Sequence, residues 1–246
     1  MAKKILVTSG KGGVGKSTVT ALLGASLANL KKETIIIELD FGLRSLDIIL
    51  GVQDNVIFDL GDVLKSECEL DEAILTCEYA PKLKLISASL DSVITYNKIN
   101  LKNLIDELDK KYEYILIDSP AGLSENINEI LSLIDEALIV VTPDLVCVRD
   151  GCKVSEILCD FGVKNQRLVI NKVKNKFIKL DILPDLDYVI DRVGVQLIAV
   201  IPEGIDIMKV TAKGTALSKD CQSFKVFNNF GRRILGETVP LLINNI

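Results

Sequence analysis

The sequence contains no histidine. Because imidazole is the usual side chain for proton transfer near neutral pH, any acid–base chemistry must rest on carboxylates or on a positioned water molecule. The six cysteines include no C-x-x-C pair, so no zinc site is expected. They are Cys68, Cys77, Cys147, Cys152, Cys159 and Cys221. Cys152 and Cys159 are seven residues apart in an expected helix and can share a face, and we expect buried, reduced thiols there.

Long apolar runs are also missing. No stretch of about 18 apolar residues occurs, so no transmembrane helix is predicted. The N-terminus enters directly into an expected strand and loop, which excludes a signal peptide, and we expect a cytoplasmic protein. The formal net charge of −5 argues against nonspecific DNA binding through a broad positive surface, but leaves a local basic patch open.

Internal repeats, low-complexity tracts and linkers rich in proline or glycine are absent as well. The 246 residues, of which 48% are hydrophobic, are enough for a sizeable core. We therefore expect residues 1–246 to form a single domain.

A glycine-rich loop near the N-terminus is the strongest motif in the chain. The apolar residues 5–7 lead into the sequence GKGGVGKST, after which helix-compatible residues begin. The pattern G-x-x-x-x-G-K-[ST] is matched at Gly10, Gly15, Lys16 and Ser17. Glycines let successive N–H groups point at phosphate oxygens, the following helix presents its positive end to the same anion, and the serine hydroxyl suits Mg²⁺. The loop therefore predicts binding of a nucleoside triphosphate with Mg²⁺, and a second lysine inside it, Lys11, is unusual.

The rest of the chain alternates apolar strand-like and helix-like segments. This alternation predicts an α/β fold, a three-layer, doubly wound and predominantly parallel sheet with helices on both faces. An amphipathic helix is expected from residue 19 to the cations at 31 and 32. Further strands are expected at 34–39, 83–88, 114–118, 137–141, 167–173 and 195–201. Further helices are expected at 101–108, 125–134, 146–161 and 179–193, with helical segments up to about residue 235.

Acidic residues follow two of the expected strands. Asp40 ends the strand that comes after the phosphate loop, at the edge where open parallel sheets bind ligands. Asp118 ends a near-continuous apolar run typical of a central parallel strand, and it resembles a Walker B aspartate that helps to hold Mg²⁺. Shortly after it, Gly122 can bring its N–H close to a γ-phosphate.

These residues together resemble the MinD branch of the deviant Walker A ATPases, which also include ParA, Soj and the nitrogenase iron protein. The resemblance rests on KGGVGKST at 11–18, GLRSLD at 42–47, DSPAG at 118–122, TPD followed by VRD at 142–150, and VIPE at 200–203. It spans residues 3 to about 236. The iron protein also supplies cluster cysteines after its Walker B strand, and none stands at 118–125 here.

The resemblance implies a P-loop fold of the SIMIBI type and a role for each matching residue. The nucleotide, ATP or ADP, is bound by Gly10, Lys11, Gly12, Gly13, Val14, Gly15, Lys16, Ser17, Thr18, Asn171 and Pro202. Mg²⁺ is held by Ser17, Asp40 and Asp118. The catalytic residues are Lys11, Lys16, Asp40 and Gly122, and Lys11 reaches the phosphates of a partner subunit. Asp144 stands where an acid holds that lysine when the dimer is apart.

The same resemblance implies a function in placing the cell-division site. It implies a homodimer with ATP sandwiched at the interface, a division inhibitor like MinC, an activator like MinE and reversible association with the inner face of the cell membrane. The membrane helix of the family is a basic amphipathic C-terminal segment, which the last residues, 239–246, do not provide. We expect it to lie beyond residue 246 in the complete gene product, and the alternative is a protein that binds membrane weakly or through a partner. Two alternatives stay open: a ParA-like module for DNA partitioning or cargo positioning, and a scaffold that binds nucleotide without hydrolysis.

Overall fold

The computed structural model describes residues 1–91, 98–122, 130–180 and 182–242. Half of the helix expected at 125–134, residues 125–129, lies outside these residues. Within the described ranges, no helix is long and apolar enough to cross a membrane.

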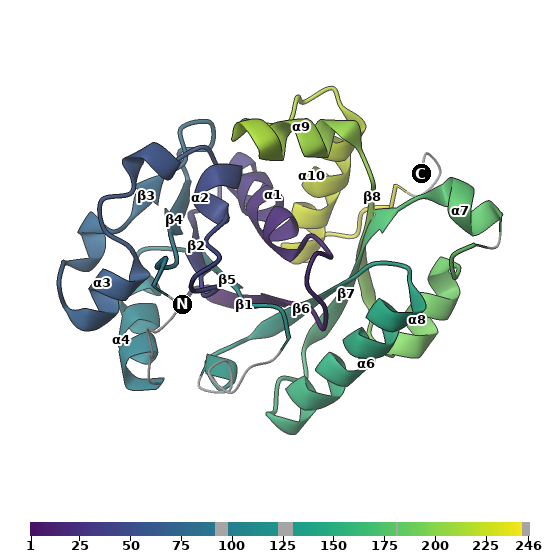
Figure 1. Cartoon of the computed structure of the whole chain (residues 1–246), viewed down its shortest axis with the longest axis horizontal. Helices are drawn as coiled ribbons and strands as arrows, with labels where there is room; N and C mark the ends of the chain where they lie inside the picture. The colour runs from purple at the N-terminus through teal and green to yellow at the C-terminus, as the bar shows by residue number, and fades with distance from the viewer. Residues whose placement is uncertain (92–97, 123–129, 181, 243–246) are drawn as a thin grey trace.

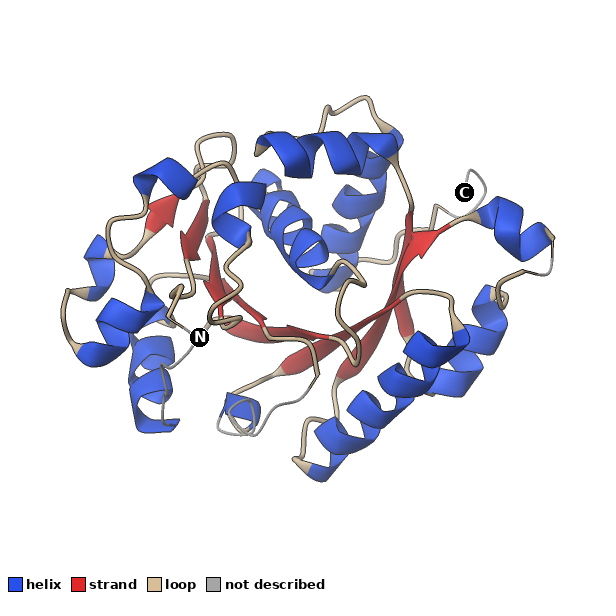
Figure 2. Ribbon diagram, in the orientation of Figure 1, coloured by secondary structure: helices blue, strands red, loops and turns tan. Residues whose placement is uncertain are grey.

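The described strands form one eight-stranded sheet, in the order β3-β4-β2-β5-β1-β6-β7-β8. Neighbouring strands run parallel except at the β3–β4 edge. Figure 2 shows the sheet as a twisted layer through the middle of the molecule. The strands are β1 (Lys3–Thr8), β2 (Thr34–Glu38), β3 (Leu75–Thr76), β4 (Leu83–Ile86), β5 (Tyr114–Asp118), β6 (Glu136–Val141), β7 (Gln166–Val173) and β8 (Leu197–Pro202).

Helices cover both faces of this sheet, which confirms the predicted doubly wound α/β class (Figure 1). One face is covered by α1 (Lys16–Asn29), α9 (Ile205–Lys213) and α10 (Gln222–Ile234), and the other by α4 (Lys98–Leu108), α6 (Leu145–Asp160) and α8 (Leu186–Val193). Short helices α3 (Leu60–Lys65) and α7 (Asn175–Lys179) lie toward opposite ends of the sheet, and α2 (Leu46–Ile49) packs against α1 and α9. Two 3-10 turns span Gln53–Asn55 and Leu70–Glu72.

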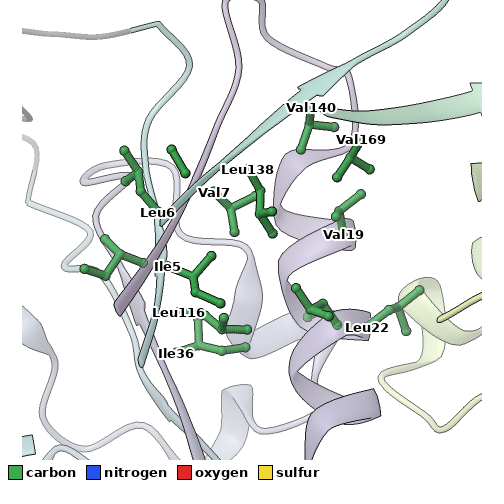
Figure 3. Packing of buried hydrophobic residues seen from close by; sticks show 14 of the residues in the cluster. Ile5, Leu6, Val7, Val19, Leu22, Ile36, Leu116, Leu138, Val140 and Val169 are labelled. Atoms are coloured by element: carbon green, nitrogen blue, oxygen red, sulfur yellow. The ribbon is translucent and has the colours of Figure 1, made fainter. Parts of the chain in front are cut away.

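The buried core lies where α1 meets the central strands. Figure 3 shows Val19 and Leu22 of α1 near apolar side chains of the sheet. Ile115, Leu116 and Ile117 of β5 are at most 1% exposed, because β5 lies between β1 and β2 and is covered on both faces. The near-continuous apolar run at 115–117 therefore reports a central strand, as predicted.

Helix α1 differs from the amphipathic helix that the sequence predicted. Residues 19–28 are all buried, including Thr20 and Ser26. The sheet covers one side of the helix and α10 the other, and Gly231 of α10 lets the two helices approach closely at Ser26. A helix enclosed on both sides has no solvent-facing stripe, so its small and polar residues are core residues.

Two further predictions need correction. The helix expected at 179–193 is replaced by α7 and α8, which are separated by residues that are not helical where they are described. Helix α8 starts after Pro184, where Asp185 caps the first turn by accepting a hydrogen bond from the Tyr188 amide. The prediction of buried thiols is wrong for Cys159, which is exposed, and Cys152 is only half-buried, because α6 covers the sheet with one face alone.

Candidate functional site

The loop between β1 and α1 lies at the carboxyl edge of the sheet, between the ends of β5, β6 and β7. Gly13 and Gly15 have φ values of 79° and 90°, in the left-handed region that favours glycine. A Cβ atom on Gly10 would lie 2.6 Å from the carbonyl oxygen of Asp150 in α6, so the loop begins in close contact with that helix. At Gly13 an added Cβ would meet no atom of the described part of the chain within 4 Å, so the loop is open on that side to these residues.

Asp118 at the end of β5 accepts hydrogen bonds from three side chains in the first turns of α1. Its Oδ2 atom accepts hydrogen bonds from Lys16 Nζ and from Ser17 Oγ, both at 2.8 Å. Its Oδ1 atom accepts one from Thr20 Oγ1 at 2.7 Å. Lys16 is 6% exposed and Asp118 is fully buried, so this ion pair is shielded from solvent.

Two further carboxylates lie near the Lys16–Asp118 pair, at the end of the neighbouring strand β2 and just after it. Asp40 lies just past the end of β2, where burial and the nearby charge of Asp118 raise its pKa and Lys16 opposes the rise. Glu38 is the register neighbour of Asp118 and is fully buried. Burial raises the pKa of Glu38 to about 7, against hydrogen bonds donated by the Ser45, Leu46 and Ala88 amides.

Lys11 points away from this centre. Its Nζ atom lies 3.7 Å from Oδ1 of Asp144, the residue that caps α6, and its side chain is 48% exposed. Partial burial raises the pKa of Asp144, but hydrogen bonds from Thr142 and Cys147 and the charge of Lys11 together bring it below its usual value. The expected pairing of Lys11 with Asp144 is therefore present, at the distance of a loose ion pair.

Gly122 lies opposite the start of the loop. Its φ is 79°, and its amide donates a hydrogen bond to the Ser9 carbonyl at 2.8 Å. This N–H therefore lies beside the phosphate loop, where it is already hydrogen-bonded to a protein carbonyl. An added Cβ at Gly122 would meet no atom of the described residues within 4 Å.

A pocket opens on the other side of the loop, between the ends of β7 and β8 and the start of α9. Its lining includes Gly15, Thr18, Asn171, Lys172, Pro202 and Met208. Asn171 is buried and its Nδ2 atom donates to the Val14 carbonyl at 2.8 Å. The two residues predicted to contact a base, Asn171 and Pro202, therefore share one pocket with the first residues of α1.

The residues present fit a nucleoside triphosphate with Mg²⁺. The loop provides a glycine cradle at the N-terminus of a 14-residue helix, and its lysine and serine converge on a carboxylate. Hydroxyl and carboxylate oxygens are the donors that Mg²⁺ prefers, with the nucleotide and water completing its shell. Within the ranges that the structure describes, no three acidic, cysteine or histidine side chains form a metal cluster.

Three residues of the site escaped the sequence reasoning. Thr20 is one helical turn after Lys16, and this spacing could have placed it on the same face. Glu38 is two residues before Asp40. The sequence does not distinguish an acid of an apolar strand that faces solvent from one that binds buried backbone amides. Lys172 donates from Nζ to the Gly13 carbonyl at 2.7 Å, and no pattern in the sequence indicated this contact.

Comparison with known proteins agrees with this geometry. Residues 1–234 match the model of the ParA family, described as NUBPL iron-transfer P-loop NTPase. The septum site-determining protein MinD of Synechocystis is 35% identical, over 98% of this chain and 92% of that protein. Its counterpart in Bacillus subtilis is 32% identical, over 99% and 92%.

Solved structures extend this similarity to the fold. In the MinC:MinD cell division protein complex of Aquifex aeolicus, a chain with 31% identity matches with a TM-score of 0.90, over 98% of both chains. The septum site-determining protein MinD of Pyrococcus horikoshii, complexed with Mg-ADP, matches with a TM-score of 0.85 and 28% identity, over 95% of this chain and 96% of that one.

Proposed function

The chain belongs to the MinD family of P-loop ATPases, and on this premise we propose that it is an ATP-driven dimerisation switch that positions the cell-division site. As a member of this family it is an ATPase that uses ATP with Mg²⁺. The proposal is carried above all by the buried convergence of Lys16 and Ser17 on Asp118, beside an open glycine loop.

In this proposal, the residues around Asp118 hold the phosphates and the metal. Lys16 would exchange its bond with Asp118 for contacts with the β- and γ-phosphates, and Ser17, Asp118 and Asp40 would hold Mg²⁺. When bound, Mg²⁺ offsets the negative charge that develops on the phosphoryl oxygens. Because Asp118 already accepts bonds from three side chains of α1, the site is largely assembled before nucleotide arrives.

Lys11 is the residue that acts across the dimer. Its side chain is half exposed and its bond to Asp144 is long, so it is the loop cation most easily released to a partner subunit. A lysine supplied by the partner adds positive charge where the transition state is most negative. Asp144 holds this lysine while the subunits are apart.

Asp40 and Gly122 act on the γ-phosphate side. With no histidine available, Asp40 orients the attacking water, and burial, which raises its pKa, favours acceptance of a proton. With nucleotide bound, the Gly122 amide would exchange the Ser9 carbonyl for a phosphate oxygen.

The remaining residues hold the nucleoside. Asn171 and Pro202 line the base pocket, and Thr18 in the same pocket lies toward the α-phosphate. Glycines 10, 12, 13 and 15, with Val14, present their amides to the phosphates.

Partners follow from the dimeric form. We propose that the ATP-bound dimer recruits a division inhibitor of the MinC type, that a MinE-type activator stimulates hydrolysis, and that the intact protein associates reversibly with an anionic membrane surface from the cytoplasmic side. Binding of a specific nucleic acid is not part of this proposal, in keeping with the net charge of −5.

The test is dimerisation measured by light scattering with Mg-ATP and with Mg-ADP. Wild-type protein should dimerise only with ATP, and Lys11→Ala should stay monomeric while still binding ATP. Because the trans cation is lost, turnover of Lys11→Ala should fall about 10³-fold. Lys102→Ala removes an exposed lysine of α4, on the other face of the sheet, and should behave as wild type.

A Lys11→Ala protein that dimerises and hydrolyses ATP normally would remove Lys11 from the mechanism. Wild-type protein that binds ATP but releases no phosphate in a single-turnover assay with candidate partners would indicate a nucleotide-binding scaffold instead. Salt-dependent retention of the ATP dimer on DNA, without binding to anionic liposomes, would favour a partitioning module.

A further inference from the structure

We propose that Lys172, together with Asn171, is a positioning residue that aims the amides of the phosphate loop at the nucleotide. The two side chains hold the loop from behind, by its carbonyl oxygens. This inference rests on the proposed function, because it concerns how the same loop binds phosphate.

The backbone at the end of β7 is bent in a way that brings both side chains to the loop. Consecutive side chains of a regular strand point to opposite faces. Lys172 has a φ of 54°, in the left-handed region, and the pairing of β7 with β8 changes register between Ile170 and Val173. The irregularity breaks the alternation, so Asn171 and its neighbour can both reach the loop.

The contacts fall on two consecutive loop carbonyls. Lys172 Nζ donates to the Gly13 oxygen at 2.7 Å, and Asn171 Nδ2 donates to the Val14 oxygen at 2.8 Å. The first bond carries a full charge, which makes it stronger than a neutral one. Two adjacent peptide groups of the loop are therefore held by two adjacent residues of one strand.

Because each peptide group is planar, fixing the carbonyls of Gly13 and Val14 also fixes the direction of the next N–H groups. In a trans peptide the C=O of one residue and the N–H of the next point opposite ways. The described chain contains no cis peptide, so the N–H of Val14 points away from Lys172 and the N–H of Gly15 points away from Asn171. Holding the carbonyls outward thus turns these two amides toward the inside of the loop, where a phosphate would lie.

The close approach at Gly15 supports the same conclusion. A Cβ on Gly15 would lie 2.4 Å from Asn171 Nδ2 and 3.6 Å from Lys172 Cε. The two side chains therefore occupy the space behind the loop and leave no room for a side chain there. A left-handed conformation is costly for lysine, and the fold retains it at a point where the side chain contacts the binding loop.

The experiment measures the dissociation constant of Mg-ADP by titration calorimetry for wild type, Lys172→Met and Lys172→Arg. Methionine keeps a Cβ and a chain of similar length but lacks the ammonium, so the backbone strain stays and only the bond to Gly13 is lost. We expect about tenfold weaker Mg-ADP binding for Lys172→Met, the loss of one charge-assisted hydrogen bond. Lys172→Arg should recover most of that affinity, and Lys102→Met should match wild type.

Two further readouts separate positioning from other roles. Adenosine, used as a millimolar competitor, should lose far less affinity for Lys172→Met than Mg-ADP does, because it has no phosphate to meet the amides, although Lys172 also lines the pocket. The tenfold loss for Mg-ADP should persist when the salt concentration is raised to about 0.5 M, where a through-space charge effect is screened. Unfolding midpoints without nucleotide verify that the variants are folded.

Unchanged Mg-ADP affinity in Lys172→Met would overturn the inference, and so would an equal loss for adenosine, which would place the lysine at the base. A loss that disappears at high salt would also overturn it. If wild-type protein bound no Mg-ADP, the proposed function would fail instead, and the two failures are thereby distinguishable.

Discussion

The phosphate loop (residues 10–15) and the segment after β2 (residues 40–47, here called the switch segment) are held in place by different means. The loop is tied to three parts of the protein: Asn171 and Lys172 hold its carbonyls, α6 lies against Gly10, and the following lysine pairs with Asp118. The switch segment is held mainly at its far end, where one buried carboxylate binds its backbone and Leu46 is buried, with a single backbone bond from the Gly42 amide to the Ser89 carbonyl nearer its start. Glu38 accepts hydrogen bonds from the amides of Ser45 and Leu46 within it and of Ala88 beyond it, while Leu43 is 74% exposed.

This difference suggests a division of labour. The loop has the rigidity that a preorganised phosphate site needs, since its bonds come from several elements at once. One anchor of the switch segment, Glu38, titrates near neutral pH because its pKa is about 7. A site built in this way can bind nucleotide without rearranging the loop, while the switch segment can change conformation when nucleotide binds or is hydrolysed.

The largest effect is expected where the buried pair of the loop is broken. Asp118→Asn leaves Lys16 buried without its counter-charge, so the free energy of unfolding without nucleotide should fall by about 3 to 5 kcal/mol. Denaturant unfolding measures this loss. Asp135→Asn removes an exposed partner of Lys4 at 3.5 Å and should cost at most about 1 kcal/mol. Equal costs for the two variants would mean that burial of the pair does not matter.

A smaller effect, a dependence of stability on pH, is expected at Glu38, which binds the backbone of the switch segment. Glu38 has a folded pKa of about 7 against an ordinary value of 4.5. Below pH 4.5 both folded and unfolded protein hold the proton, whereas between 4.5 and 7 only the folded protein does. The free energy of unfolding should therefore fall by about 3 kcal/mol as the pH rises through this window, and then level off.

Glu38→Gln removes that titration. The difference in unfolding free energy between wild type and variant, measured by urea titration from pH 4 to pH 8, isolates it from other groups. Glu78→Gln, at an exposed position, should leave the wild-type slope unchanged. If Glu38→Gln also keeps that slope, the switch segment is not anchored by a titrating carboxylate, and the contrast with the loop is lost.

The smallest effect is expected at the reacting end of the switch segment. Asp40→Ala should retain ATP binding, because the loop is assembled independently, while turnover falls about 100-fold, or about 2.7 kcal/mol in activation free energy. Filter binding and phosphate release separate the two quantities. Asp54→Ala, an exposed acid farther along the chain, is the control. Unchanged turnover in Asp40→Ala would exclude Asp40 from catalysis.

The sequence was sufficient for the fold class and for the centre of the site because both depend on local patterns. The run at 115–117 indicated a central strand, and the glycine loop with Lys16 and Ser17 indicated a phosphate site. Side chains that act through tertiary contacts could not be identified from the sequence. Glu38 and Lys172 each contact backbone groups of another segment, and such a partner leaves no periodicity or motif in the chain.

The mistaken expectations have a similar physical origin. Apolar residues at 19, 22, 23, 27 and 30 match one helical face, but the residues between them are buried too, because α10 closes over the second face of α1. Whether a helix is covered on one side or two depends on elements about 200 residues later. Local spacing also merged α7 and α8 into one helix, since both have apolar residues at helical intervals.

The enclosure of α1 has a consequence for how this protein can evolve. The helix that carries Lys16, Ser17 and Thr20 has ten consecutive buried residues, 19–28, and so no surface on which neutral substitutions can accumulate. Most exchanges along it will alter core packing and the catalytic first turn together. Drift and adaptation in partner choice are therefore confined to other surfaces, and descendants of this chain should keep this helix nearly unchanged while they diverge elsewhere.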